Sequence, residues 1–146
     1  MNDTLKWGLI GGGEGSQIGF AHRMGAELDG KFVFTAGALD ANPSRSMDYG
    51  KCLGLSEERA YGNWKEMLEG ESSRQDRIDL VTVATPNETH FEISKAFLEK
   101  GFHVFCEKPL TTSLEDAKVL VKIAQEQNRI NAVNFGYSGY PLVRQM

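Results

Sequence analysis

Two groups of residues have the types and spacing that chemistry requires, and the first is a glycine cluster. Gly11, Gly12 and Gly13 follow a short apolar run and precede a segment with helical periodicity. Bare backbone amides at the start of a helix hold a diphosphate well, because side chains at such a turn would block its approach. The third glycine of the dinucleotide fingerprint would fall at Ser16. We therefore interpret the loop as carrying an insertion of about three residues, after which Gly19 packs helix against strand.

The residues around this loop extend the prediction and also limit it. Gln17 and Ile18 open the following helix, so we expect their amides to contact the same diphosphate. Glu14 argues in the other direction, because a carboxylate beside a diphosphate is repulsive unless it points into water. A tight turn with a purely structural role therefore stays open as an alternative.

Asp40 strengthens the dinucleotide interpretation. It ends the second apolar run, roughly 20 residues after Gly19, where a carboxylate can accept hydrogen bonds from ribose hydroxyls. A 2′-phosphate at that place would meet a like charge, which favours NAD over NADP. Arg45 keeps NADP open, because a nearby arginine could receive that phosphate or stack on adenine.

The second group of residues follows two later apolar runs. Ligands of open α/β sheets bind at the carboxyl ends of the strands, and Thr85, Pro86 and Asn87 stand at such an end. His90 shares a helical face with Ile93 and Phe97, which turns it inward near the same edge. A contact between His90 and the cofactor and a structural role inside the core are both compatible with this position.

Glu107, Lys108 and Pro109 follow the next apolar run. The Lys108 ammonium could orient a substrate hydroxyl and stabilise the charge that develops on its oxygen when hydride leaves. A solvated surface lysine is the alternative. His22 and Arg23 lie too far along the first helix to touch the diphosphate, so we expect packing, capping or a salt bridge there.

The elements that position these residues alternate between short strand-like and longer helix-like patterns, which is typical of βαβ units with a mainly parallel sheet. The sequence predicts a Rossmann-type, doubly wound α/β fold with about six strands and helices on both faces. The expected strands are 5–10, 32–39, a short one near 60–61, 78–84, 102–106 and 130–133. The expected helices start at Pro43 after an Asn42 cap, run from Asn87 to about Lys100, and run from Ser113 to about Gln127; another starts near Pro141.

Composition limits the class of protein. The 146 residues suit one domain, and the net charge of −4 without a run of lysine and arginine argues against nucleic acid. No apolar stretch approaches the roughly 20 residues of a membrane span, and residues 1–7 do not resemble a signal peptide, so a cytoplasmic location is expected. Cys52 and Cys106 are interpreted as small core residues, and no metal site is predicted.

Taken together, these motifs resemble the cofactor domain of the glucose–fructose oxidoreductase, inositol dehydrogenase and rhizopine-catabolism (Gfo/Idh/MocA) family. The pair formed by Thr85-Pro86-Asn87 with His90 and by Glu107-Lys108-Pro109 is far more specific than the glycine loop. The resemblance implies that the loop holds the diphosphate, that Asp40 holds the ribose and that Thr85, Asn87 and His90 lie on the nicotinamide side. It also implies that Glu107 and Lys108 face nicotinamide and substrate, a sugar, cyclitol or related polyol.

The resemblance also predicts how the chain is divided. Residues 1–135 would form the dinucleotide-binding domain, and residues 136–146 would start the crossover to a substrate domain that this chain lacks. We therefore expect a chain that binds NAD but is not catalytically complete. A stand-alone NAD-binding regulatory module, whose apolar face would be covered by self-association into a homo-oligomer, is the main alternative. An S-adenosylmethionine-binding domain is a further one, and Glu107-Lys108-Pro109 argues against it.

Overall fold

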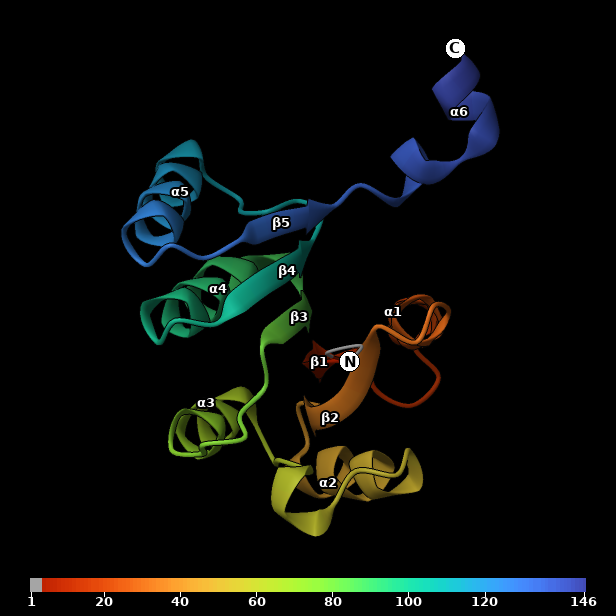
Figure 1. Cartoon of the computed structure of the whole chain (residues 1–146), viewed down its shortest axis with the longest axis vertical. Helices are drawn as coiled ribbons and strands as arrows, with labels where there is room; N and C mark the ends of the chain where they lie inside the picture. Colours follow the sequence, from red (N-terminus) through yellow and green to blue (C-terminus); the bar gives the residue numbers. More distant parts are fainter. Residues whose placement is uncertain (1–3) are drawn as a thin grey trace.

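A computed structural model describes residues 4–146, and its centre is a five-stranded sheet (Figure 1). The strands are β1 (Leu5–Gly11), β2 (Phe32–Ala38), β3 (Leu80–Ala84), β4 (His103–Glu107) and β5 (Asn131–Asn134). All neighbouring strands pair in parallel, in the order β2-β1-β3-β4-β5. Starting from β1, the chain adds β2 on one side and then β3, β4 and β5 on the other, as expected for a Rossmann-type fold. The predicted fold class is therefore confirmed. The first three residues of the domain predicted over 1–135 lie outside the described part of the chain.

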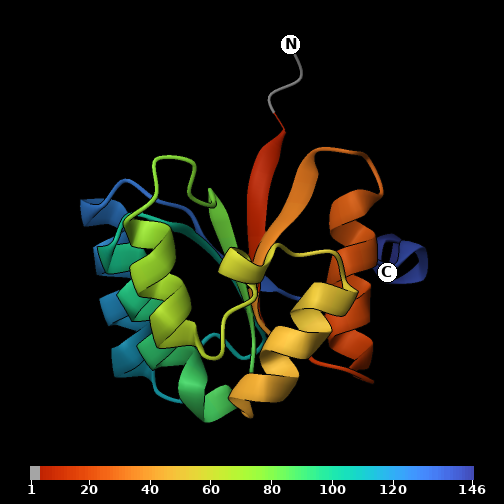
Figure 2. The same cartoon turned by 90° about the horizontal axis from the view of Figure 1, so that it is seen from below.

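Helices cover both faces of the sheet. α3 (Trp64–Ser72), α4 (His90–Glu99) and α5 (Leu114–Glu126) lie on one face, α1 (Gln17–Glu27) lies on the other, and α2 (Pro43–Cys52) packs at the β2 edge (Figures 1 and 2). Short 3₁₀ segments η1 (Glu57–Arg59), η2 (Asn87–Thr89) and η3 (Gly136–Gly139), with the terminal helix α6 (Pro141–Gln145), complete the order. Within the described residues, no helix has the length and apolar character needed to cross a membrane.

The main core lies between the sheet and α3, α4 and α5. Its centre is formed by fully buried apolar side chains, among them Val81, Val83, Phe97, Phe102 and Leu120. β3 is buried on both faces because it is the central strand, which explains its continuous apolar run. A smaller cluster around Trp7, Leu9 and Leu39 lies on the α1 side.

The predicted helix signals are confirmed at the atomic level. The Asn42 side chain caps α2 by accepting from the Arg45 amide, and Ser113 caps α5 by accepting from the Asp116 amide. Gly101 has the positive φ of 75° expected after α4. Asn63 caps α3, a helix that the sequence analysis did not predict.

Two sequence predictions about the fold are corrected. The strand expected near Ala60 and Tyr61 is a single bridge between Gly37 and Ala60, so the sheet has five strands instead of about six. The segment is too short to extend because η1 ends at Arg59 and the cap of α3 begins at Asn63. Cys52, expected in the core, is exposed at the end of α2, whereas Cys106 is buried as predicted.

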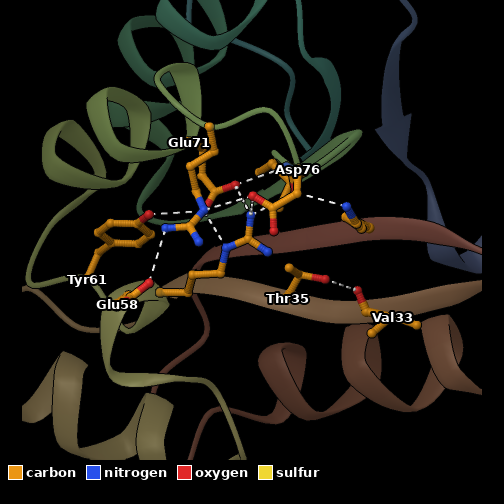
Figure 3. A network of polar contacts seen from close by, with 10 residues as sticks. Val33, Thr35, Glu58, Tyr61, Glu71 and Asp76 are labelled. Atoms are coloured by element: carbon orange, nitrogen blue, oxygen red, sulfur yellow. Dashed lines mark hydrogen bonds and ion pairs between the residues drawn. The ribbon is translucent and has the colours of Figure 1, made fainter.

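A polar network fixes α3 to the start of β3 (Figure 3). The fully buried Glu71 carboxylate accepts from Arg59 Nη2 at 3.2 Å, the Tyr61 hydroxyl at 3.0 Å and the Ile78 amide at 2.9 Å. Burial, followed by the charge of Glu71, raises the pKa of the Tyr61 phenol. The network lies where the chain enters β3, at the amino ends of the strands, so it supports the sheet from the edge opposite the predicted ligand site.

The α1 face of the sheet is only partly covered. A hollow of about 660 Å³ lies between α1 and strands β3, β4 and β5, and its lining includes Leu80, Phe105 and Ala132. The segment after β5 also exposes large apolar side chains, namely Phe135, Tyr137, Tyr140, Leu142, Val143 and Met146. In many proteins, an exposed apolar surface of this kind is an interaction site.

Candidate functional site

The predicted site residues meet along one edge of the sheet. Because all five strands are parallel, their carboxyl ends lie together. Asp40 follows β2, the glycine cluster follows β1, Thr85 follows β3 and Glu107 ends β4. The strand order therefore places the four motifs side by side, in the order in which an extended dinucleotide would meet them.

The glycine loop has backbone conformations and close approaches that residues with a side chain do not fit. Gly11 and Gly12 have φ values of 80° and 66°, in the region that favours glycine. A Cβ on Gly12 would lie 2.7 Å from the Cα of Gly19, and a Cβ on Gly19 would collide with the Gly12 carbonyl. The predicted packing of Gly19 against the strand turn is thus confirmed. Gly13 has an ordinary φ, but its Cβ would lie 2.6 Å from the Leu39 carbonyl oxygen.

The start of α1 supplies exposed amides at this loop. The Ser16 side chain caps the helix by accepting from the Gly19 amide at 3.1 Å. Gln17 and Ile18 form the first turn after this cap and are exposed, so their amides lie at the positive end of the helix dipole. Glu14, the residue that argued against an anion site, is exposed to solvent.

Asp40 stands directly beside the loop. Its Oδ1 accepts from the Asn42 amide at 2.7 Å and from Arg45 Nη2 at 2.8 Å. The Asn42 amide and then Arg45 hold the pKa of the Asp40 carboxyl below its usual range, so the group is a carboxylate at neutral pH. Oδ2 points toward Gly13, whose Cβ would lie 3.5 Å away. Arg45, which the sequence offered as a partner for a 2′-phosphate, is therefore bound to Asp40.

His90 connects the two loops at the centre of the edge. Its Nδ1 lies 2.7 Å from the Pro109 carbonyl oxygen and its Nε2 lies 2.9 Å from the Thr85 carbonyl oxygen. The residue is fully buried with Ile93 and Phe97, as its helical spacing predicted. Both ring nitrogens face backbone carbonyls, an arrangement that fits the structural role that the sequence left open. His90 thus connects the Thr85 and Pro109 loops, and its contact with the cofactor stays a prediction.

The remaining residues of the Thr85 loop lie open at the edge. The Thr85 hydroxyl oxygen accepts from the Thr89 hydroxyl at 2.7 Å, and Pro86 and Asn87 are exposed. Asn87 begins η2 and is not part of α4, so the predicted helix starts with a tighter turn. The loop therefore presents an amide side chain and a hydroxyl close to the glycine turn; a Cβ on Gly11 would lie 3.0 Å from Thr85 Cγ2.

Glu107 is nearly enclosed at this edge, with 11% of its side chain exposed. His22 Nε2 lies 2.8 Å from Glu107 Oε1, and Asn134 Nδ2 donates to the same oxygen. The Lys108 amide approaches Oε2 at 3.3 Å. The Lys108 side chain is exposed beyond the end of β4.

Sequence reasoning anticipated only part of this arrangement. The salt bridge or packing expected of His22 and Arg23 is confirmed, since Arg23 stacks on Tyr49 and also donates to its hydroxyl at 3.1 Å. The connection of His22 with Glu107 and Asn134 was missed. A usable signal was present: His22 lies three residues after Gly19 on one helical face, and Asn134 ends a strand whose neighbour ends in Glu107.

Comparison with known proteins now identifies the class of domain. Residues 5–135 match the Gfo/Idh/MocA family, described as an oxidoreductase family with an NAD-binding Rossmann fold. The chain belongs to this family. The match covers every strand and all of the edge residues described above, so the resemblance inferred from the motifs is confirmed.

Individual members of the family are similar over nearly the whole chain. The chain is 44% identical, over 147 aligned positions, to the uncharacterized oxidoreductase YfiI of Bacillus subtilis. It is 32% identical to levoglucosan dehydrogenase of Pseudarthrobacter phenanthrenivorans, an alignment that covers 96% of the chain. The crystal structure of an inositol dehydrogenase homolog from Azotobacter vinelandii, complexed with NADH and myo-inositol, is 45% identical and superposes with a TM-score of 0.94 over 98% of the chain.

The family members are longer than this chain. It spans 37% of the length of YfiI, 35% of levoglucosan dehydrogenase and 38% of the inositol dehydrogenase homolog. The similarity therefore concerns the cofactor domain, and the activity of a whole protein is a matter for proposal.

Proposed function

We propose that this chain is the NAD-binding domain of an oxidoreductase that transfers hydride between a nicotinamide cofactor and a sugar, cyclitol or related polyol. The dinucleotide would lie along the carboxyl edge of the sheet, with adenosine over β2 and nicotinamide over β3 and β4. The relatives support the class of substrate, because one is a levoglucosan dehydrogenase and another was crystallised with NADH and myo-inositol.

The observation that carries the proposal is the contact between the glycine loop and the acid after β2. The backbone at Gly13 lies so close to Leu39 and Asp40 that a Cβ would fill the space between them. A diphosphate on the exposed loop amides would thus bring its adenosine ribose to Asp40 Oδ2, while Oδ1 is already engaged by Asn42 and Arg45. This combination fits the two polar groups of one half of NAD.

The residues of the edge would have different roles in binding the cofactor and the substrate. The amides of Gly12, Gly13, Gln17 and Ile18 would bind the diphosphate, and Thr85, Asn87 and Glu107 would orient the nicotinamide half. The nicotinamide ring, when bound, supplies the site that accepts or donates hydride. The Lys108 ammonium, exposed past β4, would hold the substrate hydroxyl and stabilise charge on its oxygen.

Asp40 also supports NAD as the preferred cofactor. A 2′-phosphate would approach a group that is ionised at neutral pH, and the resulting repulsion lowers the affinity for NADP. Arg45 Nη2 is paired with Asp40 at 2.8 Å, so part of the positive charge of Arg45 is already neutralised there. NADP is therefore the second choice of cofactor.

Calorimetric titration tests the proposal. We expect NAD to bind more tightly than NADP, and Asp40→Ala to weaken NAD by about tenfold and to reduce the preference, because hydrogen bonds to a charged acceptor are lost. Asp48→Ala removes an exposed carboxylate from α2 and serves as the matched control. Absence of binding by both dinucleotides at millimolar concentration would refute the proposal, and binding of S-adenosylmethionine in their place would favour the alternative of an S-adenosylmethionine-binding domain.

The same proposal predicts that the 146-residue chain turns over little or no substrate by itself. These 146 residues correspond to 37% of YfiI and 38% of the inositol dehydrogenase homolog, and the edge that they form offers Lys108 for contact with a substrate. Sugar-dependent reduction of NAD by the purified chain should therefore not exceed that of Lys108→Ala. A clear excess over this control would contradict the prediction.

A further inference from the structure

Glu107 is held from two sides by residues that the proposed function does not use. Its Oε1 receives His22 Nε2 from α1 and Asn134 Nδ2 from β5. His22 Nε2 and Glu107 Oε1 lie 2.8 Å apart, within hydrogen-bond distance. Three elements that are distant in sequence thus meet at one oxygen atom.

The alternation of β4 explains why the contact forms. His103, Phe105 and Glu107 point to the α1 face, whereas Val104 and Cys106 point into the core under α4 and α5. The Phe105 and His22 rings pack edge to face with their centroids 5.6 Å apart, which holds the imidazole over the strand. Asn134 is the register partner of Glu107 on β5. The carboxylate is therefore enclosed on the side of the sheet and open only toward its carboxyl edge.

The contact also joins the two halves of the dinucleotide site. α1 begins at the glycine loop, is fixed there by the packing of Gly19 on Gly12, and reaches Glu107 through His22 one turn later. The position of Glu107 relative to the diphosphate amides is thus set by a single rigid helix. Removing either partner takes away one of the contacts that fix the orientation of this buried carboxylate.

We propose that His22 and Asn134 are positioning residues that hold the Glu107 carboxylate against the nicotinamide half of the cofactor. This inference rests on the proposed function, because it requires NAD along the carboxyl edge. It assigns the two residues no contact with substrate or with the reacting atoms. Their effect passes through Glu107 alone, so it concerns the nicotinamide half and leaves the adenosine and diphosphate contacts unchanged.

Parallel titrations with NAD and with ADP test the inference, since ADP contains the adenosine and the diphosphate but lacks the nicotinamide riboside. We expect His22→Ala and Asn134→Ala each to weaken NAD by about tenfold, the effect of removing a hydrogen bond to a charged group. The affinity for ADP should change by less than about twofold, as for independent sites. His22→Gln, whose amide nitrogen can replace Nε2, should restore most of the NAD affinity.

The control and the double variant complete the design. His103→Gln changes a histidine on the same face of β4 at its other end, and it should affect neither ligand. In a Glu107→Gln background, His22→Ala should produce no further loss of NAD affinity, because the residue acts only through Glu107. Equal losses for NAD and ADP, or an undiminished effect in that background, would overturn the inference. If the unmodified chain bound neither ligand, the proposed function itself would fail.

Discussion

Asp40 and Cys106 illustrate how the environment determines the chemistry of a single side chain. Asp40 receives a backbone amide and a guanidinium at the surface, which lowers its pKa and keeps it charged. Burial raises the pKa of the Cys106 thiol to about 11, and the neighbouring Glu107 carboxylate adds to this shift. Asp40 lies at the surface after β2 and can accept hydrogen bonds, whereas Cys106 points from β4 into the core and is enclosed.

The contrast between the two cysteines gives a prediction at this scale. At pH 8 the Cys106 thiol stays protonated and enclosed, whereas Cys52 is exposed on α2. A thiol-specific chromogenic reagent should therefore modify Cys52 rapidly in the native chain and reach Cys106 only in urea. The variant Cys52→Ser should show no rapid modification. Two equally fast thiols in the native chain would contradict the burial of Cys106.

Single residues could be predicted from sequence where the backbone dictates their type. A side chain on Gly12 or Gly19 would have no space between the strand turn and the helix. Asp40 follows its strand at the expected distance. At these positions the residue type is itself the sequence signal. The contact of His22 with Glu107 spans 85 residues of sequence and depends on how α1 crosses the sheet. No local pattern encodes that crossing. For the same reason the two carbonyl partners of His90 were not predicted, although its burial was.

At the scale of elements, local signals and packing contribute differently. Asn42 and Ser113 are caps whose side chains bond the amides expected of them, and α2 and α5 start where predicted. The segment at Ala60 has the composition of a strand, but its neighbours are a 3₁₀ turn and a helix cap, and tertiary packing leaves it one bridge. The buried residues of α3 are Met67 and Glu71, and their contacts attach the helix to the rest of the fold.

The Glu71 network predicts how much α3 depends on that contact. Glu71→Ala would leave Arg59 buried without its main partner and three donors unsatisfied, so we expect a loss of about 3 kcal/mol in the free energy of unfolding. Urea denaturation measures this directly. Glu69→Ala, an exposed position on the same helix, should change the stability by less than about 0.5 kcal/mol. Similar values for the two variants would show that the network adds no stability.

At the scale of the whole molecule, the residues at the two edges of the sheet have different roles. The amino edge carries the Glu71 network, which stabilises the fold, and the carboxyl edge carries the residues of the proposed dinucleotide site. The apolar hollow beside α1 lies on the face of the sheet and is separate from this site, although His22 and Asn134 border both. The sequence indicated the edge, since strand order follows from the βαβ pattern. It did not indicate the hollow, which arises because one helix covers a face that spans five strands.

The location of the cofactor is the central claim, and an NMR titration of the ¹⁵N-labelled chain with NAD tests it most directly. We predict that the amide shifts concentrate on the carboxyl edge, at Gly12, Gly13, Asp40 and Thr85. The amides of residues that line the hollow, such as Leu80 and Ala132, should change little. Shifts confined to the hollow, or no shifts at saturating NAD, would contradict the account.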